Sequence, residues 1–243
     1  MEITTLAERP ELERALPELS GEWPGFTGYD PVTQARWADI PRLFPEFVIV
    51  ATADGELVAR GFSVPFRSRG PLPGTGWDQV MIWAFHDRTA GTGPDTVSAI
   101  EITIRGDRRG TGLSGTMLAA MRDNAAARGF GELVAPVRPN AKHLEPRTPM
   151  AEYAHRTRAD GLPHDPWLRV HVRAGGVIDS VAPASMVVAG SLAQWRDWTG
   201  LPFDTPGPVE VPQALVPVSC SLDHDHAVYV EPNVWVRHSL RTT

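Results

Sequence analysis

The sequence predicts an α/β fold, because strand-type and helix-type patterns alternate along it. The clearest case is residues 98–140. Within it, 99–104 alternates isoleucine with small or polar residues, which is the pattern of a half-buried strand. A glycine-rich loop follows. From Leu113 the apolar residues recur at helical spacing, and 132–137 is again short and apolar. We expect this strand–loop–helix–strand unit to form the centre of the fold.

The residues before this unit predict further strands and helices. A strand is expected at 2–6, and helices are expected at 11–19, 31–43 and 77–88. Asp54 and Gly55 separate two apolar runs, 47–52 and 57–64, and this dipeptide is the strongest hairpin signal in the chain.

The residues after the unit continue the alternation. The sequence predicts helices at 166–174 and 192–199, and strands or apolar runs at 177–181, 185–190, 209–218 and 227–236. No stretch with the composition of a linker separates these elements. We therefore expect one domain over 1–243, with a core at about 45–190 and a β-rich extension, 191–243, packed on it.

Composition narrows the class of protein. The net charge of −6 and the pI near 5.7 argue against a nucleic-acid-binding surface. The single cysteine, Cys220, cannot form an internal disulfide and is expected to be a buried structural thiol in a reducing compartment. The first residues do not resemble a signal peptide, and no run approaches 18 apolar residues. These features predict a cytoplasmic protein without a membrane span.

The glycine-rich loop before Leu113 predicts a phosphate site. The first turn of a helix leaves backbone N–H groups without partners, and these donors suit a phosphate or pyrophosphate. Glycines at 110, 112 and 115 would allow close approach of such a group. The loop lacks the lysine of a P-loop. Its G-x-G-x-x-G spacing matches a dinucleotide fingerprint, but the surrounding elements do not alternate as that fold requires.

Residues 109–114, Arg-Gly-Thr-Gly-Leu-Ser, resemble the R/Q-x-x-G-x-G/A signature of the GNAT superfamily of acyl-CoA-dependent N-acyltransferases. Ser114 stands where glycine or alanine is usual. The resemblance covers about 45–190 and implies a mixed, mainly antiparallel sheet with helices on both faces. It implies direct transfer of an acetyl or other acyl group from acyl-CoA to a primary amine of a small molecule.

The resemblance also implies where the donor binds. The loop would hold the pyrophosphate of CoA, and the strand before it would splay from its neighbour to admit the pantetheine arm. A bulge near Ile104 would supply the backbone donor for the oxyanion. The residues expected to contact acetyl-CoA are Ile102, Ile104, Arg109, Gly110, Thr111, Gly112, Leu113, Ser114 and Asn140.

Two residues are candidates for the chemistry. Glu101 occupies the position of the glutamate that deprotonates the amine in many members of the superfamily; the alternative is a solvated or salt-bridged strand glutamate. His171 aligns with the tyrosine that serves the family as general acid, and an imidazole titrates near neutral pH. The alternative for His171 is a surface histidine near a helix C-terminus.

The sequence gives less information about the acceptor site than about the donor site. Trp83 and His86 lie on the helix before the central strand, and His143 and Tyr153 lie in the insertion after Asn140. These four are the candidate acceptor contacts. His224-Asp225-His226 lacks further ligands, so no metal is expected.

Two alternative functions stay open on the same fold. One uses a carrier-protein thioester or an aminoacyl-tRNA as donor, and the other is a non-catalytic module that binds acyl-CoA. No membrane partner is expected. The sequence does not distinguish a monomer from a homodimer.

Overall fold

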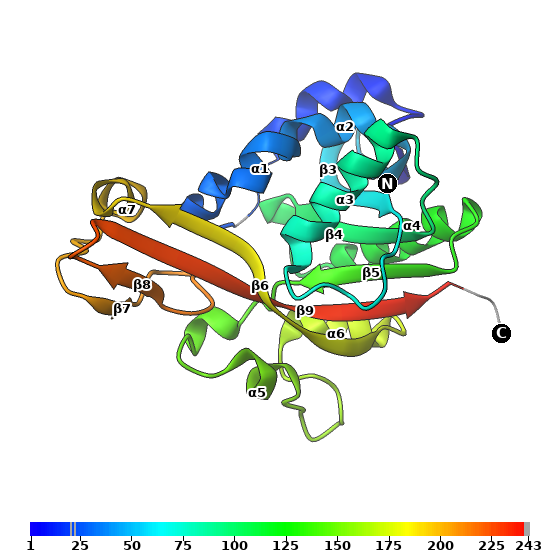
Figure 1. The fold of residues 1–243 in the computed structure, drawn as a ribbon. Coiled ribbons are helices and arrows are strands. Elements are labelled where there is room, and N and C mark those ends of the chain that lie inside the picture. Colours follow the sequence, from blue (N-terminus) through cyan, green and yellow to red (C-terminus); the bar gives the residue numbers. More distant parts are fainter. Residues whose placement is uncertain (20, 22, 241–243) are drawn as a thin grey trace.

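The structure, a computed structural model, describes residues 1–19, 21 and 23–240 (Figure 1). Its strands are β1 Glu2–Thr5, β2 Val48–Ala53, β3 Glu56–Phe66, β4 Thr96–Ile104, β5 Glu132–Val137, β6 Val177–Gly190, β7 Gly207–Val209, β8 Val218–Ser221 and β9 His226–Ser239. Its α-helices are α1 Pro31–Arg36, α2 Ile40–Leu43, α3 Gly76–Ala90, α4 Leu113–Ala127, α5 Met150–Ala154, α6 Pro166–Arg173 and α7 Leu192–Thr199. The 3₁₀ helices are η1 Pro10–Glu18, η2 Gly25–Tyr29, η3 Trp37–Asp39, η4 Pro45–Phe47, η5 Gly106–Arg108 and η6 Lys142–Leu144.

Prolines explain several differences from the predicted elements. The helix expected over 31–43 is divided into α1, η3 and α2, with Pro41 near the start of the last. The helix expected over 11–19 is the 3₁₀ helix η1, Pro10–Glu18, which contains Pro17. The prediction of a strand over 209–218 is wrong, because only the two ends of this segment belong to strands, β7 and β8. Pro212 and Pro217 lie between these ends and have no N–H group to donate to a strand ladder.

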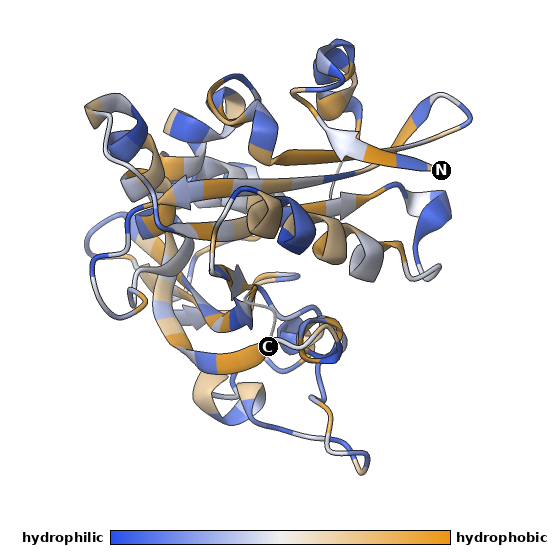
Figure 2. Ribbon diagram, turned by 90° about the vertical axis from the view of Figure 1, so that its right-hand side faces the viewer, coloured by the Kyte–Doolittle hydropathy of each residue, from blue (hydrophilic) through white to orange (hydrophobic). Residues whose placement is uncertain are grey.

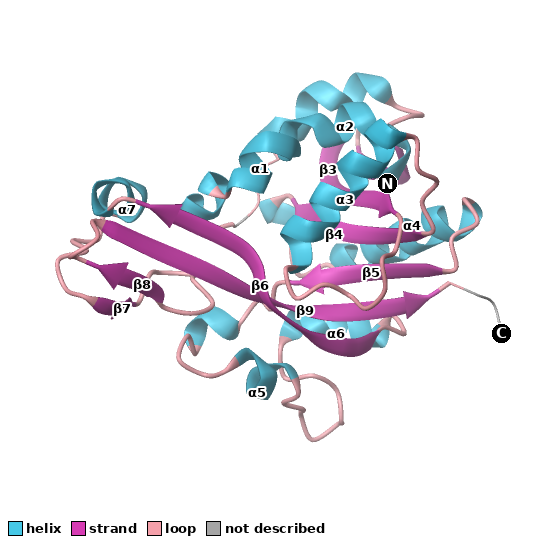
Figure 3. Ribbon diagram, viewed as in Figure 1, coloured by secondary structure: helices cyan, strands magenta, loops and turns pink. Residues whose placement is uncertain are grey.

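One mixed sheet organises the described residues (Figure 3). Its order is β1-β2-β3-β4-β5-β9-β8-β7, and β6 pairs with the second edge of β9. Among the described strands, β4 and β5 form the only parallel pair. The expectation of a mainly antiparallel mixed sheet is confirmed.

The helices cover both faces of this sheet. Neighbouring residues of a strand point to opposite faces. A Cβ on Gly61 would lie 2.8 Å from Sδ of Met121, so this face of β3 packs against α4. The next residue, Phe62, packs on Trp37, whose ring lies 6.3 Å from that of Trp77 in α3. Apolar residues are concentrated on the strands between these layers (Figure 2).

The C-terminal strand β9 lies inside the sheet. Val234–Ser239 pairs with β5, and the beginning of the strand pairs with β8. Together β6 and β9 form a long ribbon that reaches a second apolar cluster around Trp195, Tyr229 and the buried Cys220 (Figure 3). The segment expected as an extension therefore supplies a strand beside β5. The single-domain organisation stays a prediction.

None of the helices in the described residues is long and apolar enough to cross a membrane.

Candidate active site

The central feature of the site is a gap between β4 and β5. The parallel pairing consists of Val97 with Leu133 and Ser98 with Val134, and it stops there. Beyond this point, 99–104 of β4 and 135–137 of β5 both line a cavity of about 430 Å³. Pro136 has no N–H group to offer a ladder. The strands therefore diverge and leave room for an extended group between them.

The glycine loop closes one end of this cavity. Gly110 and Gly112 have φ values of 74° and 85°, which favour glycine. The amides of Gly115 and Thr116 donate to the carbonyl of Gly112, at 3.0 and 3.3 Å. In the described part of the chain, the amides of 110–114 donate to no backbone carbonyl. These donors, at the positive end of α4, can bind an anion.

The third glycine has a different role. A Cβ on Gly115 would meet only Cγ1 of Val170, at 4.0 Å, and its φ is not in the left-handed region. Gly115 therefore faces α6 rather than the anion donors. The expectation that it allows close approach of a phosphate is wrong.

Most of the predicted donor contacts lie on the cavity. The described lining includes the following predicted residues: Ile102, Ile104, Arg109, Gly110, Gly112, Leu113, Ser114 and Asn140. Thr111 is absent from that lining, and its hydroxyl donates to the carbonyl of Arg108 at 2.7 Å. This hydrogen bond closes the loop, and a contact of Thr111 with the donor stays a prediction.

Glu101 reaches the cavity, but it is not a free side chain. Nε and Nη2 of Arg60 donate to its two carboxylate oxygens at 3.0 and 2.9 Å, and the Thr103 hydroxyl donates at 2.6 Å. Glu101 is 5% exposed and Arg60 is 8% exposed. Oε2 accepts one of these bonds and Oε1 accepts two, so Oε2 can accept another. The salt-bridged alternative is therefore the observed state.

The backbone bulge lies at Ile100. The β3–β4 register shifts between Phe62 and Ser63, which leaves Ile100 without an opposite residue. Nε1 of Trp77 donates to the Ile100 carbonyl at 3.2 Å. Ile104, in contrast, pairs regularly with Ala59. The expectation of a bulge at Ile104 is wrong.

His171 is a buried cavity residue. Its Nδ1 lies 3.0 Å from Nε2 of His238, and its ring meets Trp167 edge-on. Burial, with a smaller contribution from His238, lowers the pKa of His171 to about 3. Burial and the charge of Arg122 lower the pKa of His238 to about 4. Both rings are neutral at neutral pH, so the expected imidazolium acid at His171 is wrong.

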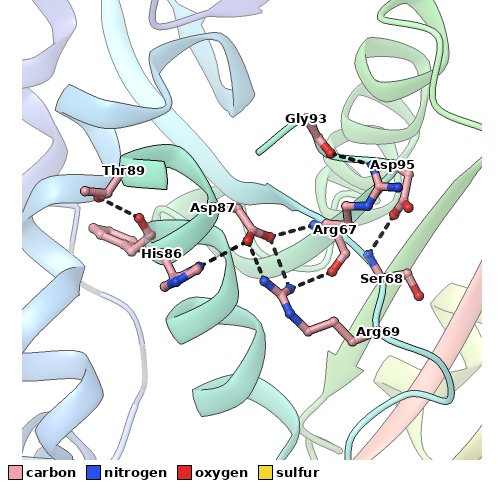
Figure 4. Close-up of polar contacts among 9 residues, drawn as sticks. Arg67, Ser68, Arg69, His86, Asp87, Thr89, Gly93 and Asp95 are labelled. Carbon is pink, nitrogen blue, oxygen red and sulfur yellow. Dashed lines mark hydrogen bonds and ion pairs between the residues drawn. The ribbon is translucent and has the colours of Figure 1, made fainter. Parts of the chain in front are cut away.

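The four predicted acceptor residues are absent from the cavity lining in the described part of the chain. His86 belongs to a polar cluster around Asp87 (Figure 4), and Trp83 lies beside Arg69 of that cluster. Arg69 donates to both Asp87 oxygens and lies over the Trp83 ring, while Nδ1 of His86 is 3.4 Å from Asp87. Burial by itself would raise the pKa of Asp87, but hydrogen bonds from Arg69 and the Arg67 amide lower it below its usual value. This cluster joins α3 to the segment after β3.

Tyr153 also has a structural contact. Its hydroxyl donates to Asp165 at 3.0 Å, and Asp165 caps α6 through the amides of Trp167 and Leu168. His143 is half-buried in η6, away from the cavity lining. None of the four is among the described lining residues of the cavity, and their contact with an acceptor stays a prediction.

Three residues near the site were missed by the sequence analysis. Arg60 is a charged residue between buried residues in the middle of a strand, and that contrast was the available signal. Trp23 and Arg138 line the cavity from two different segments. Only Arg138 had a sequence signal, as a cation directly after an apolar strand and before Pro139.

Comparison with known proteins decides the family. No protein-family model matches the chain. A curated relative, the arginine N-acetyltransferase avaD of Aspergillus versicolor, is 34% identical over 98% of this chain and 93% of its own length. The chain belongs to the GNAT family of N-acetyltransferases. This GNAT acetyltransferase is an enzyme with acyl-CoA-dependent N-acetyltransferase activity.

Solved structures agree on the fold of this GNAT acetyltransferase. The loading GNATL domain of CurA from Lyngbya majuscula has a TM-score of 0.64 at 16% identity, over 98% of this chain and 97% of that domain. The GphF GNAT-like decarboxylase in complex with isobutyryl-CoA has a TM-score of 0.58 at 15% identity, over 99% of this chain and 100% of that one.

The described residues of the GNAT acetyltransferase contain no group of three or more metal-binding side chains.

Proposed function

We propose that this enzyme transfers the acetyl group of acetyl-CoA to a primary amine of a small molecule, and that free L-arginine is such an acceptor. The observation that carries the proposal is that one cavity joins the open amides of 110–114 to the gap between β4 and β5 and to Glu101. The name of the curated relative supports arginine.

The donor would lie along this cavity. The amides of 110–114 and the guanidinium groups of Arg108 and Arg109 suit the pyrophosphate. The gap between the strands suits the pantetheine arm, whose amides need backbone partners there. Asn140, at the end of β5, is exposed and offers one more polar contact.

The chemistry requires three events. The amine attacks the thioester carbon, the tetrahedral oxyanion is stabilised, and the C–S bond breaks with release of the CoA thiolate. We propose that Glu101 accepts the amine proton, directly or through a water molecule. Support comes from its place as the only carboxylate among the described lining residues. The proton on the leaving sulfur would not come from an imidazolium at His171, because that ring is neutral.

Two measurements test this proposal together. Calorimetric titration with acetyl-CoA gives the donor affinity, and free CoA thiol released in the presence of L-arginine gives the turnover. We expect Glu101→Gln to keep the affinity and to reduce kcat by about 100-fold or more. The matched control is Glu152→Gln, an exposed carboxylate paired with Arg156. Absence of acetyl-CoA binding by the unaltered protein would overturn the proposal.

A further inference from the structure

The cavity carries a cation that the donor and the chemistry do not use. Among its described lining residues, Arg108 and Arg109 lie at the phosphate end, whereas Arg138 directly follows β5. The Arg138 side chain is 15% exposed. Its guanidinium lies 5.8 Å from the centre of the Trp23 ring, which also lines the cavity.

Arg138 is held in place by a buried network. Its Nε donates to Oε2 of Glu231 at 3.1 Å, and its Nη2 donates to the Gln213 carbonyl at 2.6 Å. Glu231 has no exposure, and it also accepts from the Tyr229 hydroxyl at 2.8 Å and from the Asn233 amide at 3.1 Å. The guanidinium is therefore held in one orientation by β9 and by the loop that contains Gln213.

This arrangement leaves part of the guanidinium for a ligand. Arginine has five N–H donors in a planar fork, and the two bonds above use only two of them. A rigid guanidinium at the wall of a cavity is suited to a carboxylate, which accepts two parallel hydrogen bonds. Because the buried network already orders the Arg138 side chain, binding of a ligand costs little further side-chain conformational entropy.

We propose that Arg138 binds the carboxylate of the acceptor, so that the acceptor class is free α-amino acids. This inference rests on the proposed function and specifies its acceptor. The carboxylate contact would hold the amino acid with its α-amine directed along the cavity toward Glu101. An amine without a carboxylate would lose this contact and bind less tightly.

The test compares L-arginine with L-argininamide on the unaltered protein. We expect kcat/KM to be about 10- to 100-fold higher for the acid, mainly through KM, because the contact is present before and during the reaction. The ammonium group of the amide is more acidic, so amine reactivity alone would favour the amide. A preference for the acid therefore reports the carboxylate contact.

Variants assign that preference to Arg138. Arg138→Lys keeps the charge beside Glu231 but lacks the planar fork, and we expect the acid-to-amide ratio to fall close to one with an unchanged acetyl-CoA affinity. Arg42→Met, which removes an exposed arginine of α2, is the matched control and should keep the ratio. If Arg138 variants fold poorly, equal kcat/KM for acid and amide on the unaltered protein would still overturn the inference.

Three results would overturn the inference. They are equal kcat/KM for acid and amide, an unchanged ratio in Arg138→Lys, and acetylation of simple amines with no acetylation of any common free amino acid. A loss of acetyl-CoA affinity in Arg138→Lys would assign the residue to the donor instead. Absence of acetyl-CoA binding by the unaltered protein overturns the proposed function itself, which is a separate result.

Discussion

Two nitrogens of the Arg60 guanidinium on β3 donate hydrogen bonds to the two carboxylate oxygens of Glu101 on β4, at 3.0 and 2.9 Å. Glu101 itself lines the cavity. The two residues are 41 positions apart in the chain. Because both are buried, removal of one partner leaves the other as an uncompensated charge. The pair therefore links the stability of the sheet to the position of the proposed base.

Stability measurements on this pair give the first prediction. We expect Arg60→Met to reduce the free energy of unfolding by about 3–5 kcal/mol, since it leaves the Glu101 carboxylate buried without its cation. The double variant Arg60→Met, Glu101→Leu should lose less than the single variant. Urea unfolding of the two single variants and the double variant measures this coupling. Additive losses would contradict the ion pair.

The second prediction concerns the glycine loop. Gly112→Ala places a side chain at φ 85°, where the strain is about 1–2 kcal/mol, and it shifts the amides at the start of α4. We expect acetyl-CoA affinity to fall about tenfold. Titration calorimetry measures it.

Two neighbouring glycines serve as controls for Gly112. Gly106→Ala in the same loop meets no atom within 4 Å and has no positive φ, so it should bind acetyl-CoA normally. Gly115→Ala, inside α4, should also bind normally and gain up to about 1 kcal/mol of stability. An unchanged affinity in Gly112→Ala would exclude these amides as the phosphate site.

The sequence could predict the features that depend on residues close together in the chain. The period of the apolar residues gave β4, α4 and β5, because each depends only on neighbours in the chain. The bulge at Ile100 depends on the register of β4 against β3, which no local pattern specifies. A charged imidazole was predicted at His171 because the burial that lowers its pKa comes from packing between segments distant in the chain, and His238, for example, follows 67 residues later.

The third prediction concerns the pair His171–His238. Their pKa values of about 3 and about 4 lie below the usual 6.5. As pH falls below 6.5, the unfolded chain takes up protons that the folded protein does not, so stability decreases from pH 6.5 down to about 4. The slope is at most about 1.4 kcal/mol per pH unit for each histidine.

Unfolding in urea at pH 7, 6, 5 and 4 tests this slope. The free energy of unfolding of His238→Gln should change less steeply with pH than that of the unaltered protein. The variant should also be less stable at pH 7, because it loses the hydrogen bond to His171. The control is His155→Gln, at an exposed position after α5. Identical slopes in the unaltered protein and in His238→Gln would show that the pair does not stay neutral.

The fourth prediction concerns Asp78 in the first turn of α3. Here stability is expected to decrease as pH rises, the opposite direction from the histidine pair. Burial, followed by the charge of Asp30, raises the pKa of Asp78 to about 8, and its Oδ1 is buried without a hydrogen-bond partner. The folded protein therefore keeps a proton between pH 4 and 8 that the unfolded chain has lost. This contribution to stability is complete below about pH 4, decreases as pH rises, and is lost above about pH 8.

Asp78→Asn mimics the protonated side chain and does not titrate. We expect its stability relative to the unaltered protein to increase from pH 5 to about pH 8 and to level off above that, measured by urea unfolding at pH 5, 7 and 9. Asp197→Asn, at an exposed position of α7, should show no such trend. Parallel stability curves for Asp78→Asn and the unaltered protein would mean that the folded state does not raise the pKa of Asp78.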